Sequence, residues 1–245
     1  MNVTFLGTGA STDRTYLNTA MLVESDVRIL LDCGYMIPSQ VWTLSEDGNF
    51  VDAIHISHAH YDHITGIVPL LAHMRQQGRT SALTIIGNPG IQDAIEELLH
   101  VTIPGNDGSF PFTITYLENT RPIALAQTKL SFAPSTHTIP STAIRIAHGQ
   151  RTVCYSGDGN YTDASAALYE RCDLLIHEAI SDEIIEGHGC IGEIVAMARQ
   201  AQVRRLALVH LGPEVRERLE FELKQLEQST DIDIIIPHPL HTITV

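Results

Sequence analysis

Short apolar segments separated by polar turns alternate with helically spaced segments along the whole chain. In the first half, continuous or alternating apolar residues predict strands at 3–6, 19–23, 27–31, 53–56 and 83–86. Apolar residues spaced by three or four predict helices at 64–74 and 91–99, the second entered through the turn-forming Asn88, Pro89 and Gly90. The chain is therefore expected to open as a β meander before its first helices.

The second half repeats this order of elements after a turn-rich stretch at 105–108. The pattern predicts strands at 112–116, 130–133, 142–146, 152–155, 174–177, 205–209 and 232–236. Helices are expected at 163–170, 192–201 and 214–228. Two halves that each pass from strands to mixed strands and helices predict an α/β (α+β) protein built as a four-layer αββα sandwich, with residues 1–245 as a single domain.

Composition narrows the classes of protein to consider. Hydrophobic residues make up 44% of the 245 positions and charged residues 18%, which is typical of a folded globular chain. The apolar runs fall far short of the roughly 20 residues that cross a bilayer, and no secretory signal pattern follows Met1, so a cytoplasmic location without membrane attachment is expected. The four cysteines are scattered singly and are expected to be reduced and mostly buried. A formal charge of −14 disfavours binding of long nucleic acids, which usually requires a basic face.

Candidate chemistry is concentrated between the predicted strand at 53–56 and the helix that follows it. The segment His58-Ala59-His60-Tyr61-Asp62-His63 places three imidazoles and a carboxylate within six residues. A lone histidine is more often a packed or solvated residue, but four ligand-type side chains in a loop can face the same point. The HxHxDH pattern therefore predicts a metal site.

Further ligand-type residues stand at the carboxyl ends of other predicted strands. His137 follows the strand at 130–133, Asp158 follows the strand at 152–155, and His210 ends the strand at 205–209. Small residues next to His137 and Asp158 would let those loops close around a site. We expect these three side chains to complete the metal site that HxHxDH begins.

These motifs, in this order, resemble those of the metallo-β-lactamase superfamily over essentially the whole chain. The resemblance implies two divalent metal ions, with zinc preferred and manganese or iron as alternatives. It implies that His58, His60 and His137 hold the first ion, that Asp62, His63 and His210 hold the second, and that Asp158 bridges them. Asp32, in the segment Leu-Leu-Asp-Cys-Gly, is similar to the structural acid of the superfamily, which supports the HxHxDH loop.

Within the superfamily the chain resembles the ribonuclease Z branch. The opening FLGTGA begins at Phe5, DCG begins at Asp32, and HEA places Glu178 after His177, with His188 further on. The resemblance implies a phosphodiesterase that uses a metal-bridging hydroxide, with Asp62 holding the attacking water and with Glu178 and His188 as a proton-donating pair. It also suggests a homodimer.

The departures from that branch bear on the substrate. HEAT is replaced by HEAI, HST by HGC at His188, and HFSPRY by HLGPEV at His210, so a basic residue expected near the site is missing. We find no basic, Gly- and Pro-rich insertion near the segment 137–158, where the arm that clamps transfer RNA is sought. A small-molecule or short, single-stranded nucleic-acid phosphodiester is therefore expected as substrate, rather than bulk transfer RNA.

Other readings remain open at this point. Carboxylic ester, thioester or lactam hydrolysis could use the same metals, although no helical thiol-binding domain accompanies the motifs. A scaffold that has lost its chemistry is disfavoured because all seven ligand positions are occupied. His177 and the remaining histidines, His55 among them, are expected to be structural or surface residues.

Overall fold

Two seven-stranded sheets form the centre of the computed structural model, which describes residues 1–102, 109–230 and 232–245. The turn-rich stretch expected at 105–108 lies outside these residues. The first sheet has the order β14-β1-β2-β3-β4-β5-β6. Its strands are β1 (Asn2–Gly7), β2 (Ala20–Glu24), β3 (Arg28–Leu31), β4 (Ala53–Ile56), β5 (Leu83–Gly87), β6 (Ile114–Glu118) and β14 (Thr242–Thr244).

The second sheet has the order β13-β12-β11-β10-β9-β8-β7. Its strands are β7 (Ile123–Leu125), β8 (Thr128–Ser135), β9 (Ser141–His148), β10 (Arg151–Tyr155), β11 (Leu174–Glu178), β12 (Arg205–Val209) and β13 (Asp233–Ile235). Each sheet is antiparallel at one end and parallel at the other, with β3 to β6 parallel in the first and β10 to β13 parallel in the second. Loops that follow the parallel strands of one sheet therefore emerge at a common edge.

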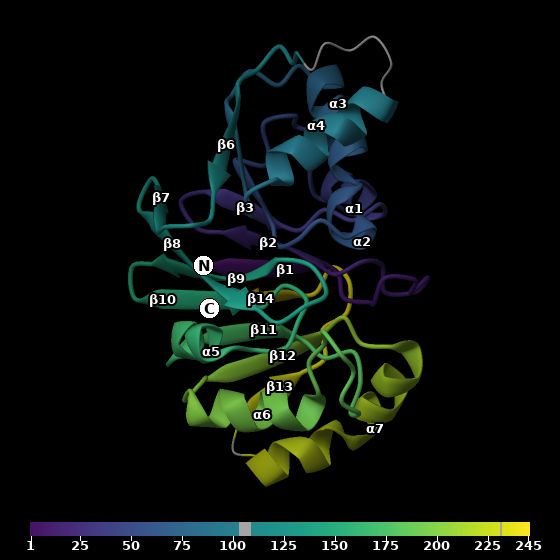
Figure 1. Cartoon of the computed structure of the whole chain (residues 1–245), viewed down its shortest axis with the longest axis vertical. Coiled ribbons are helices and arrows are strands. Elements are labelled where there is room, and N and C mark those ends of the chain that lie inside the picture. Colours follow the sequence, from purple (N-terminus) through teal and green to yellow (C-terminus); the bar gives the residue numbers. More distant parts are fainter. Residues whose placement is uncertain (103–108, 231) are drawn as a thin grey trace.

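Helices cover the outer face of each sheet (Figure 1). The first sheet carries α1 (Ile37–Leu44), α2 (Tyr61–Ile64), α3 (Ile67–Gln76) and α4 (Ile91–Thr102). The second carries α5 (Asp163–Tyr169), α6 (Ile191–Gln200) and α7 (Pro213–Thr230). The expected αββα sandwich is thereby confirmed.

Three apolar clusters hold these four layers together. One lies between the two sheets and includes Phe5, Ile144 and Ile176, all fully buried. The other two fill the space between each sheet and its helices, with Leu70 representative of the first sheet's side and Leu208 of the second's. Strands buried on both faces explain why the sequence showed continuous apolar runs in place of strict alternation.

The structure adds elements that the sequence pattern did not predict: α1, β7 and β14. The helix expected at 64–74 is in fact two helices, separated at Thr65 and Gly66. The backbone N–H of Gly66 donates to the Cys33 carbonyl at 2.8 Å, and a Cβ at Gly66 would lie 2.1 Å from the Gly34 carbonyl oxygen. Close approach of the chain after β3 therefore interrupts the helix.

Two further expectations concern the cysteines and membrane attachment. All four cysteines are buried and free of disulfides, as expected. Within the described residues, no helix combines the length and apolar character that crossing a membrane requires.

Candidate metal centre

The HxHxDH segment leaves the carboxyl end of β4 and turns directly into α2. His58 is fully buried, His60 directly precedes the first turn of α2, and Asp62 and His63 lie within that turn. A helix of only four residues gains little stability from its own hydrogen bonds, so tertiary contacts must hold it in place. Those contacts converge on Asp32.

Asp32 fixes this segment through four hydrogen bonds to its carboxylate. Oδ1 accepts from the Ser57 N–H at 2.7 Å, and Oδ2 accepts from the Ser57 hydroxyl at 2.8 Å. Oδ2 also lies 2.8 Å from His63 Nδ1 and accepts from the Tyr155 hydroxyl at 2.7 Å. Asp32 belongs to neither group of candidate metal donors described below. This agrees with the expectation that it is a structural acid and not a metal ligand. The sequence did not predict a role for Tyr155, because no local pattern shows that a tyrosine in one sheet will hydrogen-bond to a residue of the other sheet.

A first group of candidate donors contains His58, His60 and His137. His58 Nε2 lies 3.0 Å from His60 Nδ1, and that atom lies 3.1 Å from His137 Nε2. Nitrogens at about 2.0–2.1 Å from a tetrahedral zinc ion are separated by roughly 3.3 Å, so the spacing is close to that of a coordination sphere. His137 is itself oriented by the Gly187 carbonyl, which lies 2.5 Å from its Nδ1.

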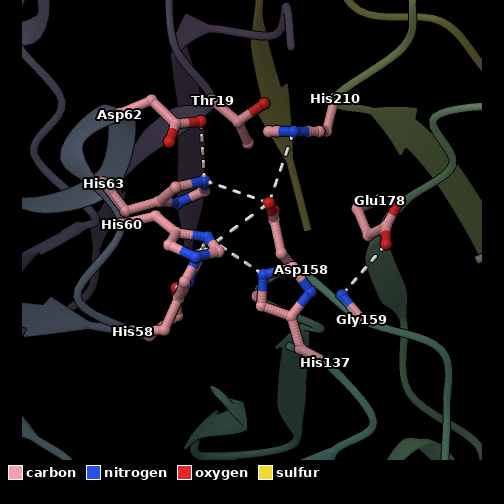
Figure 2. A network of polar contacts seen from close by, with 12 residues as sticks. Thr19, His58, His60, Asp62, His63, His137, Asp158, Gly159, Glu178 and His210 are labelled. Atoms are coloured by element: carbon pink, nitrogen blue, oxygen red, sulfur yellow. Dashed lines mark hydrogen bonds and ion pairs between the residues drawn. The ribbon is translucent and has the colours of Figure 1, made fainter. Parts of the chain in front are cut away.

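A second group contains Asp62, His63, Asp158 and His210, and all four are buried (Figure 2). His63 Nε2 lies 3.2 Å from Asp62 Oδ2 and 3.3 Å from Asp158 Oδ2. His210 Nε2 lies 3.3 Å from the same Asp158 oxygen, and His58 Nε2 from the first group lies 3.9 Å from it. Asp158 therefore stands between the two groups, where the resemblance placed a bridging ligand.

Several polar atoms of the second group are buried without a hydrogen bond. They are Asp62 Oδ2, His63 Nε2, Asp158 Oδ1 and His210 Nδ1. Unsatisfied buried polar atoms are rare in folded proteins and costly, and here they cluster among imidazoles and carboxylates. Imidazole and carboxylate donors at this spacing fit a divalent cation, which could take Asp62 Oδ2 and His63 Nε2 as ligands.

The electrostatics of the cluster favour the metal-binding form of some donors, such as His58 and Asp158, but not of His63. Burial and the neighbouring charge of His63 lower the pKa of His58, which favours the neutral imidazole. Burial opposes ionisation of Asp158, but His210 and His63 outweigh it and hold the pKa of Asp158 well below its usual value. Neutral imidazoles and ionised carboxylates are the ligand forms that divalent metals require. Burial opposes protonation of His63, but Asp158 and Asp32 raise its pKa well above the usual value, so a metal ion bound there would displace a proton.

Glu178 and His188 form a separate pair beside the two groups. The buried Glu178 carboxylate accepts from the backbone N–H groups of Gly159 and Gly189, each at 2.9 Å, and lies 3.1 Å from His188 Nδ1. Burial opposes protonation of His188, but its hydrogen bond to Glu178 outweighs burial and raises its pKa. The His188 ring lies 5.0 Å from that of His137 and 6.0 Å from that of His210, centroid to centroid. The His188 ring therefore lies beside both donor groups, and Glu178 contacts the donors through His188.

His177 does not join this cluster. It is fully buried, and its Nδ1 lies 2.7 Å from the Glu178 carbonyl oxygen. The chain between His137 and Asp158 consists of the β9–β10 hairpin and short loops. All of it is described, and no further segment is inserted between these elements.

Comparisons with known proteins agree with this geometry. Ribonuclease Z of Methanothermobacter thermautotrophicus is 27% identical and covers 93% of this chain and 92% of its own length. The probable metallo-hydrolase YhfI of Bacillus subtilis is 28% identical over 77% of each chain. Its crystal structure, described as that of a metallo-β-lactamase fold protein, superposes with a TM-score of 0.81 over 99% of this chain and 98% of its own. Human tRNase Z, short form, shares the fold, with a TM-score of 0.80 at 22% identity over 100% of this chain and 99% of its own.

These likenesses confirm the resemblance to the ribonuclease Z-like branch of the metallo-β-lactamase superfamily and place the chain among its metal-dependent hydrolases. A more specific match covers nearly all of the sequence. The family described as Anti-Pycsar protein Apyc1 matches residues 1–229, and the chain belongs to that family.

Proposed function

We propose that this protein is a two-metal phosphodiesterase that hydrolyses a small or short single-stranded phosphodiester rather than bulk transfer RNA. The observation that carries the proposal is the position of Asp158, whose Oδ2 lies 3.3 Å from His63 and His210 of one donor group and 3.9 Å from His58 of the other. A carboxylate in this position suits two cations that share one ligand. Zinc fits the donor set, and manganese or iron would also be accepted by it.

Two divalent ions in such a site would lower the pKa of a water molecule, orient it for in-line attack and stabilise charge on the phosphoryl oxygens. The protein's own side chains supply the remaining steps. Asp62 accepts the proton of the attacking water, and its pKa is held low by His63 although burial opposes this. His188, whose pKa is raised by its hydrogen bond to Glu178, donates a proton to the leaving oxygen.

The proposed limit on substrate size rests on charge and on the missing arm. With a formal charge of −14, the chain lacks the excess of basic residues that large RNA ligands require. The β9–β10 hairpin occupies the segment between His137 and Asp158. A small diester, recognised mainly through its phosphate, makes fewer demands on the protein surface.

The test is hydrolysis of bis(p-nitrophenyl) phosphate by protein of known metal content, with a precursor transfer RNA assayed alongside. Asp62→Ala should abolish most of the activity on the small diester, whereas Asp93→Ala, at an exposed carboxylate in α4, should retain it. Cleavage of the diester without processing of the RNA would support the proposal. Efficient RNA processing would contradict the substrate limit, and inactivity on both would contradict the phosphodiesterase.

The proton-donor role has its own test. His188→Ala should slow phosphodiesters with poor leaving groups, such as a dinucleoside monophosphate that must release a sugar hydroxyl, far more than bis(p-nitrophenyl) phosphate, because nitrophenolate leaves without a proton. General acid catalysis contributes about 10²–10⁴-fold, and that range bounds the expected difference. Equal losses on both kinds of substrate would refute the assignment.

A further inference from the structure

A buried arginine lies at the start of α7, three residues after Pro213. The side chain of Arg216 is only 1% exposed. Its Nη2 donates to the Thr8 carbonyl at 2.9 Å and to the Thr8 hydroxyl at 3.0 Å, and its Nη1 donates to the Pro237 carbonyl at 3.2 Å. Burying a guanidinium is costly unless it is hydrogen-bonded, so this position demands specific partners.

The groups that balance the positive charge of Arg216 are not metal donors. Its guanidinium carbon lies 4.0 Å from the centre of the Tyr16 ring, and Nη1 lies 3.7 Å from Glu220 Oε1. Arg216 therefore contacts backbone, an aromatic face and one acid. An effect on the metal centre must pass through one of these neighbours.

Thr8 is the neighbour that reaches the metal centre. Its carbonyl oxygen accepts a second hydrogen bond, from the backbone N–H of His210, at 2.9 Å. Thr8 also donates its own N–H to the Tyr16 carbonyl at 2.9 Å, and the next residue, Gly9, forms a β-bridge with Leu211. One carbonyl thus joins Arg216 to the residue that carries a donor side chain.

His210 occupies a backbone conformation that needs such support. Its φ is +56°, in the left-handed region, which costs a non-glycine residue roughly 1–2 kcal/mol. The preceding residue, Val209, is fixed by the hydrogen bond from the Ala179 N–H to its carbonyl at 3.0 Å. The Thr8 carbonyl fixes His210 itself, and the direction of the His210 ring depends on both.

We propose that Arg216 is a positioning residue that, through Thr8, holds His210 in the conformation that completes the second donor group of Asp62, His63, Asp158 and His210. This inference rests on the proposed two-metal function. Glu214 stands where the family motif has its basic residue. Two positions after Glu214, the basic side chain of Arg216 is buried and donates hydrogen bonds to Thr8.

The test measures metal binding and needs no substrate. Metal-free wild-type protein, Arg216→Lys and Arg216→Met are titrated with Zn²⁺ against a competing chelator, and the unfolding temperature of each metal-free protein is recorded. Lysine keeps the charge but cannot reach Thr8 and Pro237 together with a planar fork. Arg205→Lys serves as the matched control. Arg205 lies at the end of β12 opposite to His210, and its Nε donates to Asp233 at 2.5 Å.

The wild type should bind two ions, and Arg216→Lys should bind one of them about 10–100-fold less tightly, the range typical of residues that orient a metal ligand without binding the metal. The affinity for the other ion should be unchanged, as should both affinities of the Arg205→Lys protein. Should Arg216→Met fail to fold, Thr8→Val, which removes only one acceptor of Arg216, should still weaken the same ion by a smaller factor.

The outcomes separate the two proposals. A wild type that binds a single ion would contradict the two-metal site and the role of Arg216 with it. Two ions in the wild type with unaltered affinities in Arg216→Lys would overturn only the role of Arg216. A lower unfolding temperature with equal losses at both ions would likewise show that Arg216 supports the fold without positioning His210.

Discussion

Tyr155 offers a sharp test of how the metal centre is supported, because it joins the two sheets through a single hydrogen bond. Its hydroxyl, on β10 of the second sheet, donates at 2.7 Å to Oδ2 of Asp32, which follows β3 of the first. Both residues are fully buried. Burial raises the pKa of Tyr155 well above its usual value, so the hydroxyl remains a donor at any working pH.

Tyr155→Phe removes this donor while preserving the shape of the ring. A hydrogen bond to a charged acceptor contributes about 1.5–3 kcal/mol, and Asp32 keeps its three other donors, so a loss of roughly 2 kcal/mol is expected. For a chain of this length each kcal/mol shifts the midpoint by about 2–4 °C, which predicts a fall of roughly 4–8 °C. Metal content should persist, since no candidate donor is removed.

Thermal unfolding of metal-free protein, with zinc content measured after reloading, checks both parts. The same exchange at Tyr116, a half-buried residue in β6, is the matched control and should change stability by less than about 0.5 kcal/mol. A Tyr155→Phe midpoint equal to that of the control would refute the reasoning. So would loss of both ions, which would show that Asp32 needs Tyr155 to hold the loop at all.

Three further outcomes are expected. Burial lowers the pKa of His55 to about 4 from 6.5, so the stability that neutral His55 contributes is complete above pH 6.5 and is lost between pH 6.5 and about 4. His55→Leu should remove about 3 kcal/mol of the pH dependence of the unfolding free energy, measured by urea unfolding. An unchanged pH dependence in the variant would contradict this. Gly34→Ala would place a Cβ 2.0 Å from the Asp62 carbonyl oxygen, so it should lower both the unfolding temperature and the zinc content, and normal values would show that the loop can yield. Chelation should lower the unfolding temperature reversibly, because ions bind the folded chain; at a free concentration 100 times Kd the effect is about 2.7 kcal/mol per ion, and no shift would argue against folded-state binding.

Most strands and helices, and all of the candidate metal donors, could be predicted from local sequence patterns. The strand at 53–56 and the helix-type spacing at 91–99 were predicted close to their observed bounds because apolar periodicity records burial directly. The ligand-type residues could be found because HxHxDH is dense and because His137, Asp158 and His210 each follow a predicted strand. Parallel strands then bring such loop residues to one edge.

What the sequence did not reveal depends on contacts between distant segments. The three residues of β14 form a strand only because β1 offers an edge, with Val3 opposite Ile243. Tyr155 and Arg216 look like ordinary strand and helix residues, and their roles arise from partners more than 100 residues away, at Asp32 and Thr8. No local pattern records a partner at that separation.

If the proposed function is right, phosphodiester hydrolysis requires two ions that share Asp158 as a ligand. The most direct measurement is the rate of bis(p-nitrophenyl) phosphate hydrolysis as metal-free protein receives zinc in fractions of one equivalent per chain. Little activity is expected during the first equivalent and a steep rise during the second, with Asp158→Ala inactive throughout. Full activity after one equivalent, or none after two with manganese and iron also inactive, would contradict it.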